Sequence, residues 1–159
     1  MTALHRVLVI EDGTEYSDLC ARFLAARFAF TRAGDGPAAL AALAARPYDA
    51  ALLDMRFDRA TTLLGDPADA LDRAGGDPAT ARRFLEDHQG LIILGAVREA
   101  GHALPVLLSH DFGHEPRRWA NLHRRYAPVA YLSDAATPLE MADAIGLLIE
   151  GRGGARPSP

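Results

Sequence analysis

Residues Leu4 to Ile10 read LHRVLVI and run directly into the acidic pair Glu11 and Asp12. A short apolar run that is rich in β-branched residues and closed by acidic residues and Gly13 is typical of a strand buried in a parallel sheet. Helices must cover both faces of such a sheet, because both faces are apolar. The opening stretch therefore predicts an α/β fold.

The rest of the chain repeats the alternation of strands and helices. Further apolar runs of the strand type lie at Phe28–Ala33, Tyr48–Leu53, Leu104–Leu108 and Val129–Leu132. Helical segments separate these runs, and a helix over Pro138–Ile149 closes the pattern. Five strands alternating with helices predict a five-stranded parallel sheet, doubly wound by helices through right-handed crossovers.

The first and last helices have an expected buried face. For the helix opened by Thr14 we expect burial of residues at three-to-four spacing, namely Leu19, Phe23, Leu24 and Phe28. For the last helix, which Gly151 should stop, the expected buried face is Leu139, Ala142, Ile145, Leu148 and Ile149.

The connection between the third and fourth strands is too long for a simple crossover. Between Asp54 and Leu104 lie 49 residues, whereas one helix with two short loops takes roughly 20 to 25. We therefore expect a helical insertion over about residues 56–88, between the third strand and the third helix. Asp66-Pro67 and Asp77-Pro78 each have the form of an N-cap followed by proline in the first turn. They predict two helical pieces, the second of which continues into the third helix.

Length and composition are those of one globular domain. Of the 159 residues, 49% are apolar and 24% are charged, and we assign residues 1–150 to the domain and 151–159 to a disordered tail. The net charge of −4 does not indicate a nucleic-acid surface. A lone cysteine, Cys20, excludes an internal disulfide, and no apolar stretch has the length of a membrane span or a signal peptide. We expect a cytoplasmic protein with no membrane contact and no direct nucleic-acid contact.

Three carboxylates fall at strand ends that should lie side by side. Glu11 and Asp12 follow the first strand and Asp54 follows the third, at the sheet edge where ligands of open parallel sheets bind. Clustered carboxylates repel one another unless a cation offsets their charge, and all-oxygen ligands suit Mg²⁺. A carboxylate beside Mg²⁺ can act as a nucleophile toward phosphorus. The pattern predicts a Mg²⁺-dependent acidic site.

Four motifs in this order resemble the response-regulator receiver (CheY-like) family. They are VLVIED at the first strand, ALLD at the third, PVLLS at the fourth and AYLSDAATPLEM at the fifth. Together they cover nearly the whole chain except the insertion and the tail. The resemblance implies a flavodoxin-like fold of receiver type and a place in two-component phosphorelay signalling.

The resemblance also implies a role for each matching residue. Asp54 corresponds to the phosphoacceptor, Ser109 to the switch hydroxyl and Tyr131 to the aromatic switch residue. The implied Mg²⁺ ligands are Glu11, Asp12, Asp54 and the backbone carbonyl of Arg56.

The chain departs from the family pattern at several places. Asp134 stands where the family has a phosphoryl-binding lysine, and the chain contains no lysine at all. His110 stands where a small residue usually leaves the pocket open, so it could gate entry. Two alternatives are open for the Arg56 side chain: it neutralises the pocket as a fixed cation, or it pairs on the surface with Asp58.

The leading hypothesis is a receiver that accepts a phosphoryl group on Asp54 from a histidine kinase or phosphotransfer protein. It would signal to a downstream protein partner by direct contact, with homodimerisation as a further possibility, and would not be an enzyme. The alternative is a pseudo-receiver, a scaffold that works without phosphorylation. A Mg²⁺-dependent aspartyl hydrolase ranks low, because such enzymes generally have an acid/base carboxylate where this chain has Arg56.

Overall fold

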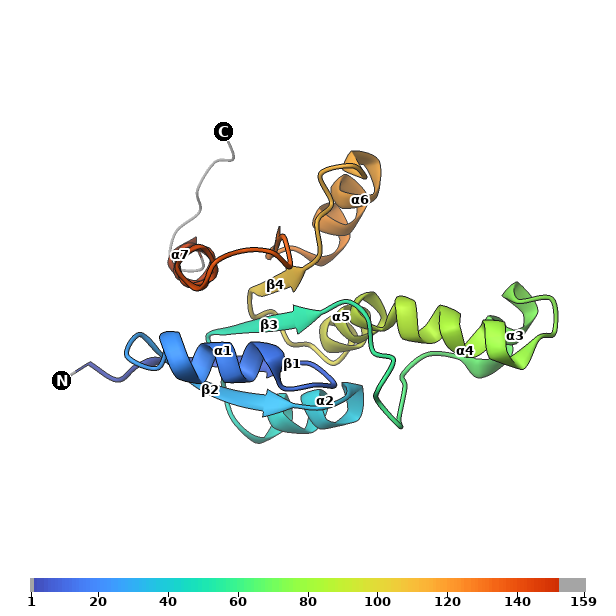
Figure 1. Cartoon of the computed structure of the whole chain (residues 1–159), viewed down its shortest axis with the longest axis horizontal. Helices are drawn as coiled ribbons and strands as arrows, with labels where there is room; N and C mark the ends of the chain where they lie inside the picture. Colours follow the sequence, from blue (N-terminus) through green and yellow to red (C-terminus); the bar gives the residue numbers. More distant parts are fainter. Residues whose placement is uncertain (1, 152–159) are drawn as a thin grey trace.

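Five parallel strands form one sheet within residues 2–151, the part of the chain that the computed structural model describes. The strands are β1 His5–Ile10, β2 Phe28–Ala33, β3 Ala50–Asp54, β4 Val106–Ser109 and β5 Val129–Leu132. Their order is β2-β1-β3-β4-β5, and every neighbouring pair is parallel. The predicted sheet is confirmed (Figure 1).

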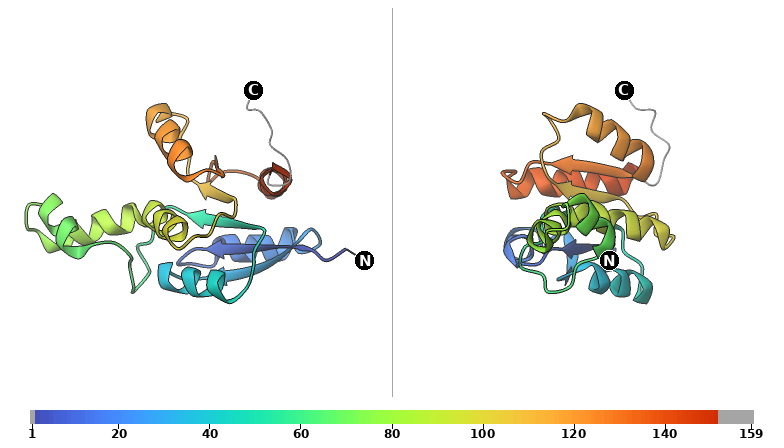
Figure 2. Two further views of the ribbon diagram at one scale, coloured as in Figure 1. Left: turned by 180° about the vertical axis from the view of Figure 1, so that it is seen from behind. Right: turned by 90° about the vertical axis from the view of Figure 1, so that its right-hand side faces the viewer.

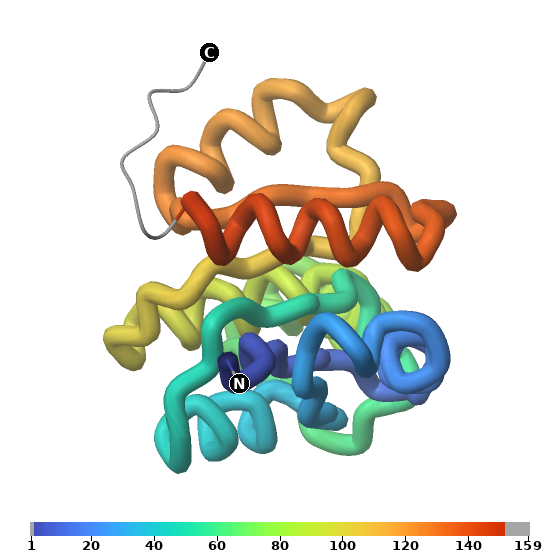
Figure 3. The backbone as a smooth tube through the Cα atoms, turned by 90° about the vertical axis from the view of Figure 1, so that its left-hand side faces the viewer, coloured from blue at the N-terminus to red at the C-terminus, as the bar shows by residue number. Residues whose placement is uncertain are grey.

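Helices cover both faces of the sheet. They are α1 Glu15–Phe23, α2 Gly36–Ala45, α3 Pro67–Arg73, α4 Pro78–Asp87, α5 Gln89–Glu99, α6 Pro116–Tyr126 and α7 Pro138–Gly151. Helices α1 and α7 lie on one face, as Figure 3 shows, and α2, α5 and α6 lie on the other (Figure 2). Within the described residues, no helix is long and apolar enough to span a membrane.

Successive side chains of a strand point to opposite faces of the sheet. Alternate residues of each strand therefore pack into two separate hydrophobic cores. Leu8 and Ile10 of β1 pack with Ile93 of α5 on one face. Val7 and Val9 pack with the α1 and α7 side chains on the other face. All five of these side chains are at most 1% exposed, so β1 is buried on both faces.

Two predicted helix faces are partly wrong. Helix α1 ends at Phe23, which is 57% exposed, and the chain turns back at Leu24 so that Phe28 is buried as the first residue of β2. In α7 the buried face is centred on Met141 and Ile145, which lie four residues apart, and Leu139 points away from it with 65% exposure. The predicted tail begins at Gly151, the last residue of α7, and residues 152–159 lie outside the described part.

The insertion consists of two helices, as predicted. The Asp66 carboxylate accepts a hydrogen bond from the N–H of Ala68 (2.9 Å) at the start of α3, and Asp77 does the same for Thr80 (3.2 Å) in α4. Helices α4 and α5 are separated only by a turn at His88. Helix α3 packs on α4, and both project beyond the carboxyl end of β3 (Figure 1).

Candidate functional site

Asp54 ends β3, which lies between β1 and β4, and the winding of the sheet reverses between β1 and β3. Asp54 is level with Ser109 at the end of β4, and the preceding Leu53 is level with Ile10 of β1. The half-buried Asp54 carboxylate accepts a hydrogen bond of 2.8 Å from the N–H of Met55. The parallel register therefore brings Asp54, Ser109 and the acidic pair after β1 to one edge of the sheet.

Glu11 holds the start of α1. Its side chain, 1% exposed, accepts hydrogen bonds from the N–H groups of Tyr16 (3.1 Å) and Ser17 (2.8 Å), and from the Ser17 hydroxyl (3.1 Å). Thr14 occupies the N-cap position but makes no side-chain cap bond, so Glu11 takes over that role. Burial raises the pKa of Glu11 although these donors lower it.

Asp12 is bound by a residue that the sequence did not single out. The N–H of Arg59 donates to Asp12 (2.6 Å), and the Arg59 guanidinium lies 3.8 Å from the same carboxylate. That guanidinium also donates two hydrogen bonds, of 2.9 and 3.0 Å, to Glu15. The bond from Arg59 lowers the pKa of Glu15 to about 2. We call this three-residue arrangement the Arg59 clamp.

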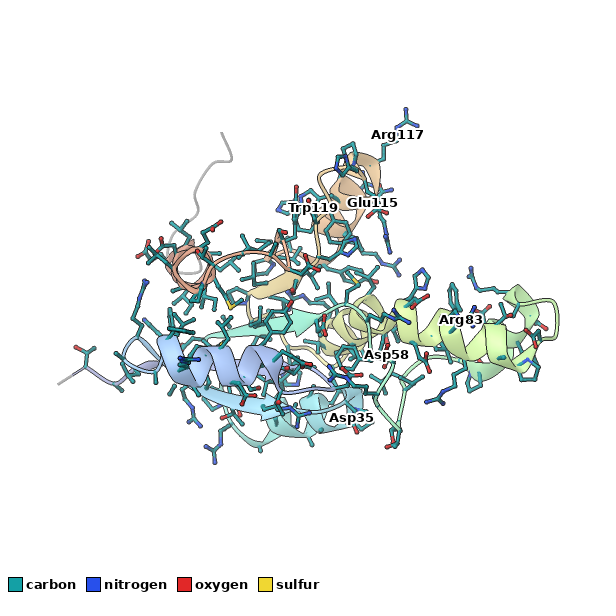
Figure 4. The ribbon with its side chains drawn as sticks, viewed as in Figure 1. Asp35, Asp58, Arg83, Glu115, Arg117 and Trp119 are labelled. Atoms are coloured by element: carbon teal, nitrogen blue, oxygen red, sulfur yellow. The ribbon has the colours of Figure 1, made fainter. Side chains whose placement is uncertain are left out.

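Arg56 does not act as the fixed cation of the pocket. Its guanidinium pairs with Asp58 (3.5 Å) and with Asp87 at the end of α4 (3.1 Å). The alternative of a surface ion pair with Asp58 is therefore the correct one. Asp58 lies where the chain leaves the sheet for the insertion, and Arg83 lies farther out on α4 (Figure 4).

Ser109 is engaged by a second residue that the sequence reasoning missed. The hydroxyl groups of Tyr16 and Ser109 are hydrogen-bonded to each other across 93 positions of sequence. Ser109 is 7% exposed, and burial raises the pKa of the Tyr16 phenol. Tyr16 lies in the first turn of α1 and faces the end of β4, which only the folded arrangement reveals.

Tyr131 and His110 belong to an aromatic cluster beside the site. Tyr131 lies edge-to-face against Phe112 and Trp119, with ring centroids 5.4 and 4.7 Å apart. His110 lies against Phe112 (4.5 Å) and pairs with Glu115 at the start of α6 (3.1 Å). Trp119 comes from α6 and Glu115 directly precedes this helix, whereas Arg117 points away from the molecule (Figure 4).

These residues surround an open cavity of about 400 Å³. Its lining is Glu15, Tyr16, Asp54, Met55, Arg56, Arg59, Ser109, His110 and Asp134. The sequence predicted five of these positions, and the structure brings them together. Glu11, Asp12 and Tyr131 are not among the lining residues, and Asp134 lies exposed at the rim.

Asp54 holds its proton more tightly than a free aspartate. Burial raises its pKa to about 6, the bond from Met55 opposes the shift, and the charges of Asp12 and Glu11 add to it. A bound cation would relieve this repulsion. The donors present, two carboxylates and a backbone carbonyl, have the oxygen chemistry of a Mg²⁺ site. Within residues 2–151, no three acidic, histidine or cysteine side chains are gathered closely enough to hold a metal by themselves.

The structure resembles receiver domains over most of its length. The receiver domain of the Francisella response regulator 1452 is 16% identical at a TM-score of 0.64, with 94% of this chain and 99% of that chain covered. A CheY-like response regulator receiver domain protein from Methanospirillum hungatei JF-1 is 14% identical (TM-score 0.63, 95% and 98% covered). Chemotaxis protein CheY4 of Vibrio cholerae is 15% identical (0.62, 92% and 99%).

No family model matches the sequence, and no curated protein matches it. At such low identities the likeness is one of fold. The chain has the CheY-like, flavodoxin-type fold of response-regulator receiver domains.

Proposed function

We propose that this protein is a receiver module that accepts a phosphoryl group on Asp54 from a histidine kinase or phosphotransfer protein. The observation that carries the proposal is the position of Asp54. It lines an open cavity at the switch point of a receiver-type sheet, level with Ser109 and within the charge field of Asp12 and Glu11.

The transfer uses the Asp54 carboxylate as the nucleophile and the phosphohistidine as the donor, with a cation to offset the charge of the phosphoryl oxygens. One Asp54 carboxylate oxygen attacks the phosphorus of a phosphohistidine, and the P–O bond forms as the P–N bond breaks. The imidazole nitrogen keeps the electron pair and takes up a proton. Hydrolysis later reverses the modification, because water attacks the phosphorus and releases inorganic phosphate and the Asp54 carboxylate.

Asp12, Asp54 and the backbone carbonyl of Arg56 would hold Mg²⁺ directly. Both Glu11 oxygens already accept hydrogen bonds from α1, so Glu11 would act through water or through its charge. When bound, Mg²⁺ would neutralise the carboxylates and the incoming phosphoryl oxygens.

The signal would leave the site through protein contact. A phosphoryl group on Asp54 would compete with Tyr16 for the Ser109 hydroxyl. Because β4 pairs with β5, a shift of Ser109 at the end of β4 would then change the position of Tyr131 on β5. His110 would control access from the rim. The proposed partners are the phosphodonor and a downstream protein, or a second copy of this chain, rather than nucleic acid or a membrane.

Intact mass spectrometry tests the proposal. We expect the protein incubated with Mg²⁺ and acetyl phosphate near neutral pH to gain one phosphoryl group, and the Asp54→Asn variant to gain none. An Asp69→Asn variant, which removes an exposed carboxylate of the insertion outside the cavity lining, should still gain the group. A folded wild-type protein that gains none would contradict the proposal.

A scaffold that works without phosphorylation is the second candidate. The Arg59 clamp favours it, since a cation already lies beside Asp12 and Asp134 adds negative charge at the rim. The same experiment separates the two candidates, because a scaffold would retain its fold and its partner without any adduct.

A further inference from the structure

The cavity around Asp54 needs a positive charge that the chain does not supply in the usual way. A phosphoryl group would replace the single negative charge of Asp54 by about two, within the charge field of Asp12 and Glu11 and beside the rim residue Asp134. The chain has no lysine. A cation for the phosphoryl oxygens must therefore come from an arginine, a protonated histidine or a metal.

Arg59 is the arginine best placed to bind the phosphoryl group. Its side chain lines the same cavity as Asp54, and its charge lowers the pKa of Asp54. The other lining cations have partners outside the clamp: Arg56 pairs with Asp58 and Asp87, and His110 pairs with Glu115.

Arg59 can exchange Glu15 for another anion at a small cost in free energy. The Arg59 and Glu15 side chains are 54% and 65% exposed, and exposed ion pairs contribute little net free energy. A phosphoryl group offers more charge than Glu15 and the fork geometry that a guanidinium binds through two bonds. Gly13 leaves the clamp its room, because a Cβ there would lie 2.2 Å from both the Arg59 guanidinium and the Glu15 carboxylate.

We propose that Arg59 is the phosphoryl-binding residue of this site, taking the place of the absent lysine, and that Glu15 holds it in reserve until Asp54 is phosphorylated. This inference rests on the proposed function. It also gives the insertion a part in signalling. The Arg59 N–H is bonded to Asp12, and the N–H of Phe57, two residues earlier, donates to the backbone carbonyl of Glu86 in α4 (2.9 Å). A movement of Arg59 would therefore displace a segment that is hydrogen-bonded to α4.

The affinity of beryllofluoride, a mimic of the aspartyl phosphoryl group, tests the inference. We expect fluorine NMR titrations in Mg²⁺ to show binding about tenfold weaker or more for Arg59→Ala than for the wild-type protein, as for one lost bond to a charged group. Glu15→Gln should bind more tightly, because it releases Arg59. If the Arg59 clamp were only a structural link, Arg59→Ala and Glu15→Gln would weaken beryllofluoride binding to the same extent.

Two further variants make the test specific. Arg73→Ala is the matched control, because Arg73 also pairs with a carboxylate at 2.9 Å in the insertion, 62% exposed, but does not line the cavity. It should bind like the wild type. Asp134→Lys placed in the Arg59→Ala background should restore binding by returning a cation to the rim.

The outcomes separate this inference from the proposed function. A wild-type protein that binds beryllofluoride and gains a phosphoryl group, while Arg59→Ala behaves like Arg73→Ala, would overturn the role of Arg59 and leave Asp54 as the acceptor. A folded wild-type protein that neither gains a phosphoryl group nor binds beryllofluoride would overturn both.

Discussion

The Asp54 carboxylate is charged at neutral pH in surroundings that oppose the charge. Its pKa in the folded chain is raised from 3.8 to about 6, first by burial and then by Asp12 and Glu11. The unfolded chain releases this proton at lower pH than the folded one. The free energy of unfolding therefore falls as the pH rises from about 4 to about 6, and the loss persists above pH 6.

We predict that Asp54→Asn is more stable than the wild type near neutral pH without Mg²⁺. The difference should be about 2 kcal/mol at most, because the side chain is partly exposed and its charge is partly screened. It should shrink toward zero below pH 4. Urea denaturation of both proteins across this pH range measures the difference. If the free energies of unfolding of the two proteins changed with pH in parallel, the cost of the buried charge could not be assigned to Asp54.

The carboxylates were predictable from sequence, whereas their partners were not. Glu11, Asp12 and Asp54 end apolar strands, and parallel strands carry such ends to one edge. Arg59 meets Glu15 across 44 positions, and Tyr16 meets Ser109 across 93. No local periodicity marks such pairs, so the Arg59 clamp could not have been found before the fold.

At the scale of elements, one buried amide side chain fixes the insertion to the domain. Gln89, at the start of α5, is fully buried, and its amide donates to the carbonyls of Leu64 (3.0 Å) and Leu85 (3.2 Å). Its oxygen accepts from the Leu64 N–H (2.7 Å). Gln89 thus pairs with both backbone groups of Leu64, as a residue of a neighbouring strand would, and so fixes the segment that leads into α3.

We predict that Gln89→Met lowers the free energy of unfolding by about 2 kcal/mol, because it keeps much of the volume but leaves the buried groups of Leu64 without partners. Urea denaturation measures the loss. Hydrogen exchange should rise first in the segment around Leu64. Unchanged exchange there would mean that packing, not Gln89, holds the insertion.

Two aspartate caps should differ in what they stabilise. Asp35 accepts from the N–H of Ala38 (2.8 Å) and starts α2, whose Ala39 and Leu43 lie in the core. Asp66 starts α3, which packs mainly on α4. We predict that Asp35→Ala costs about 1 kcal/mol of global stability, measured by thermal denaturation, whereas Asp66→Ala mainly raises hydrogen exchange within α3. Equal global losses would contradict this.

The starts of α3 and α4 were predictable because aspartate followed by proline in the first turn is a strong local signal. The helix ends and faces were less so. Helix α1 stops at Phe23, before the turn to β2, so the four apolar residues proposed as one stripe divide between a helix, a turn and a strand. The break at His88 was also missed, because its residues are all compatible with a continuous helix.

For the whole molecule, the order of strands and helices in sequence was sufficient to predict the sheet. Parallel pairing and short connections leave few other arrangements. The excess length after β3 also located the insertion correctly. Its direction was not predictable, because it depends on contacts such as Arg56 with Asp87 and Gln89 with Leu64.

The surface has charge of both signs in separate places. Helix α6 carries four arginines and no acidic residue, although the chain has a net charge of −4. Acidic residues gather instead at the Asp54 cavity. The two regions meet at His110, which lines the cavity and pairs with Glu115 just before α6, so a partner at the start of α6 would lie beside the cavity.

The central claim is that Asp54 itself receives the phosphoryl group. Sodium borohydride reduces an aspartyl phosphate to homoserine, so treatment after incubation with Mg²⁺ and acetyl phosphate marks the modified residue, which peptide mass spectrometry then locates. We predict homoserine at position 54 and at no other aspartate, with none formed when the phosphodonor is omitted. Homoserine at another aspartate, or its absence from the folded protein, would contradict the account.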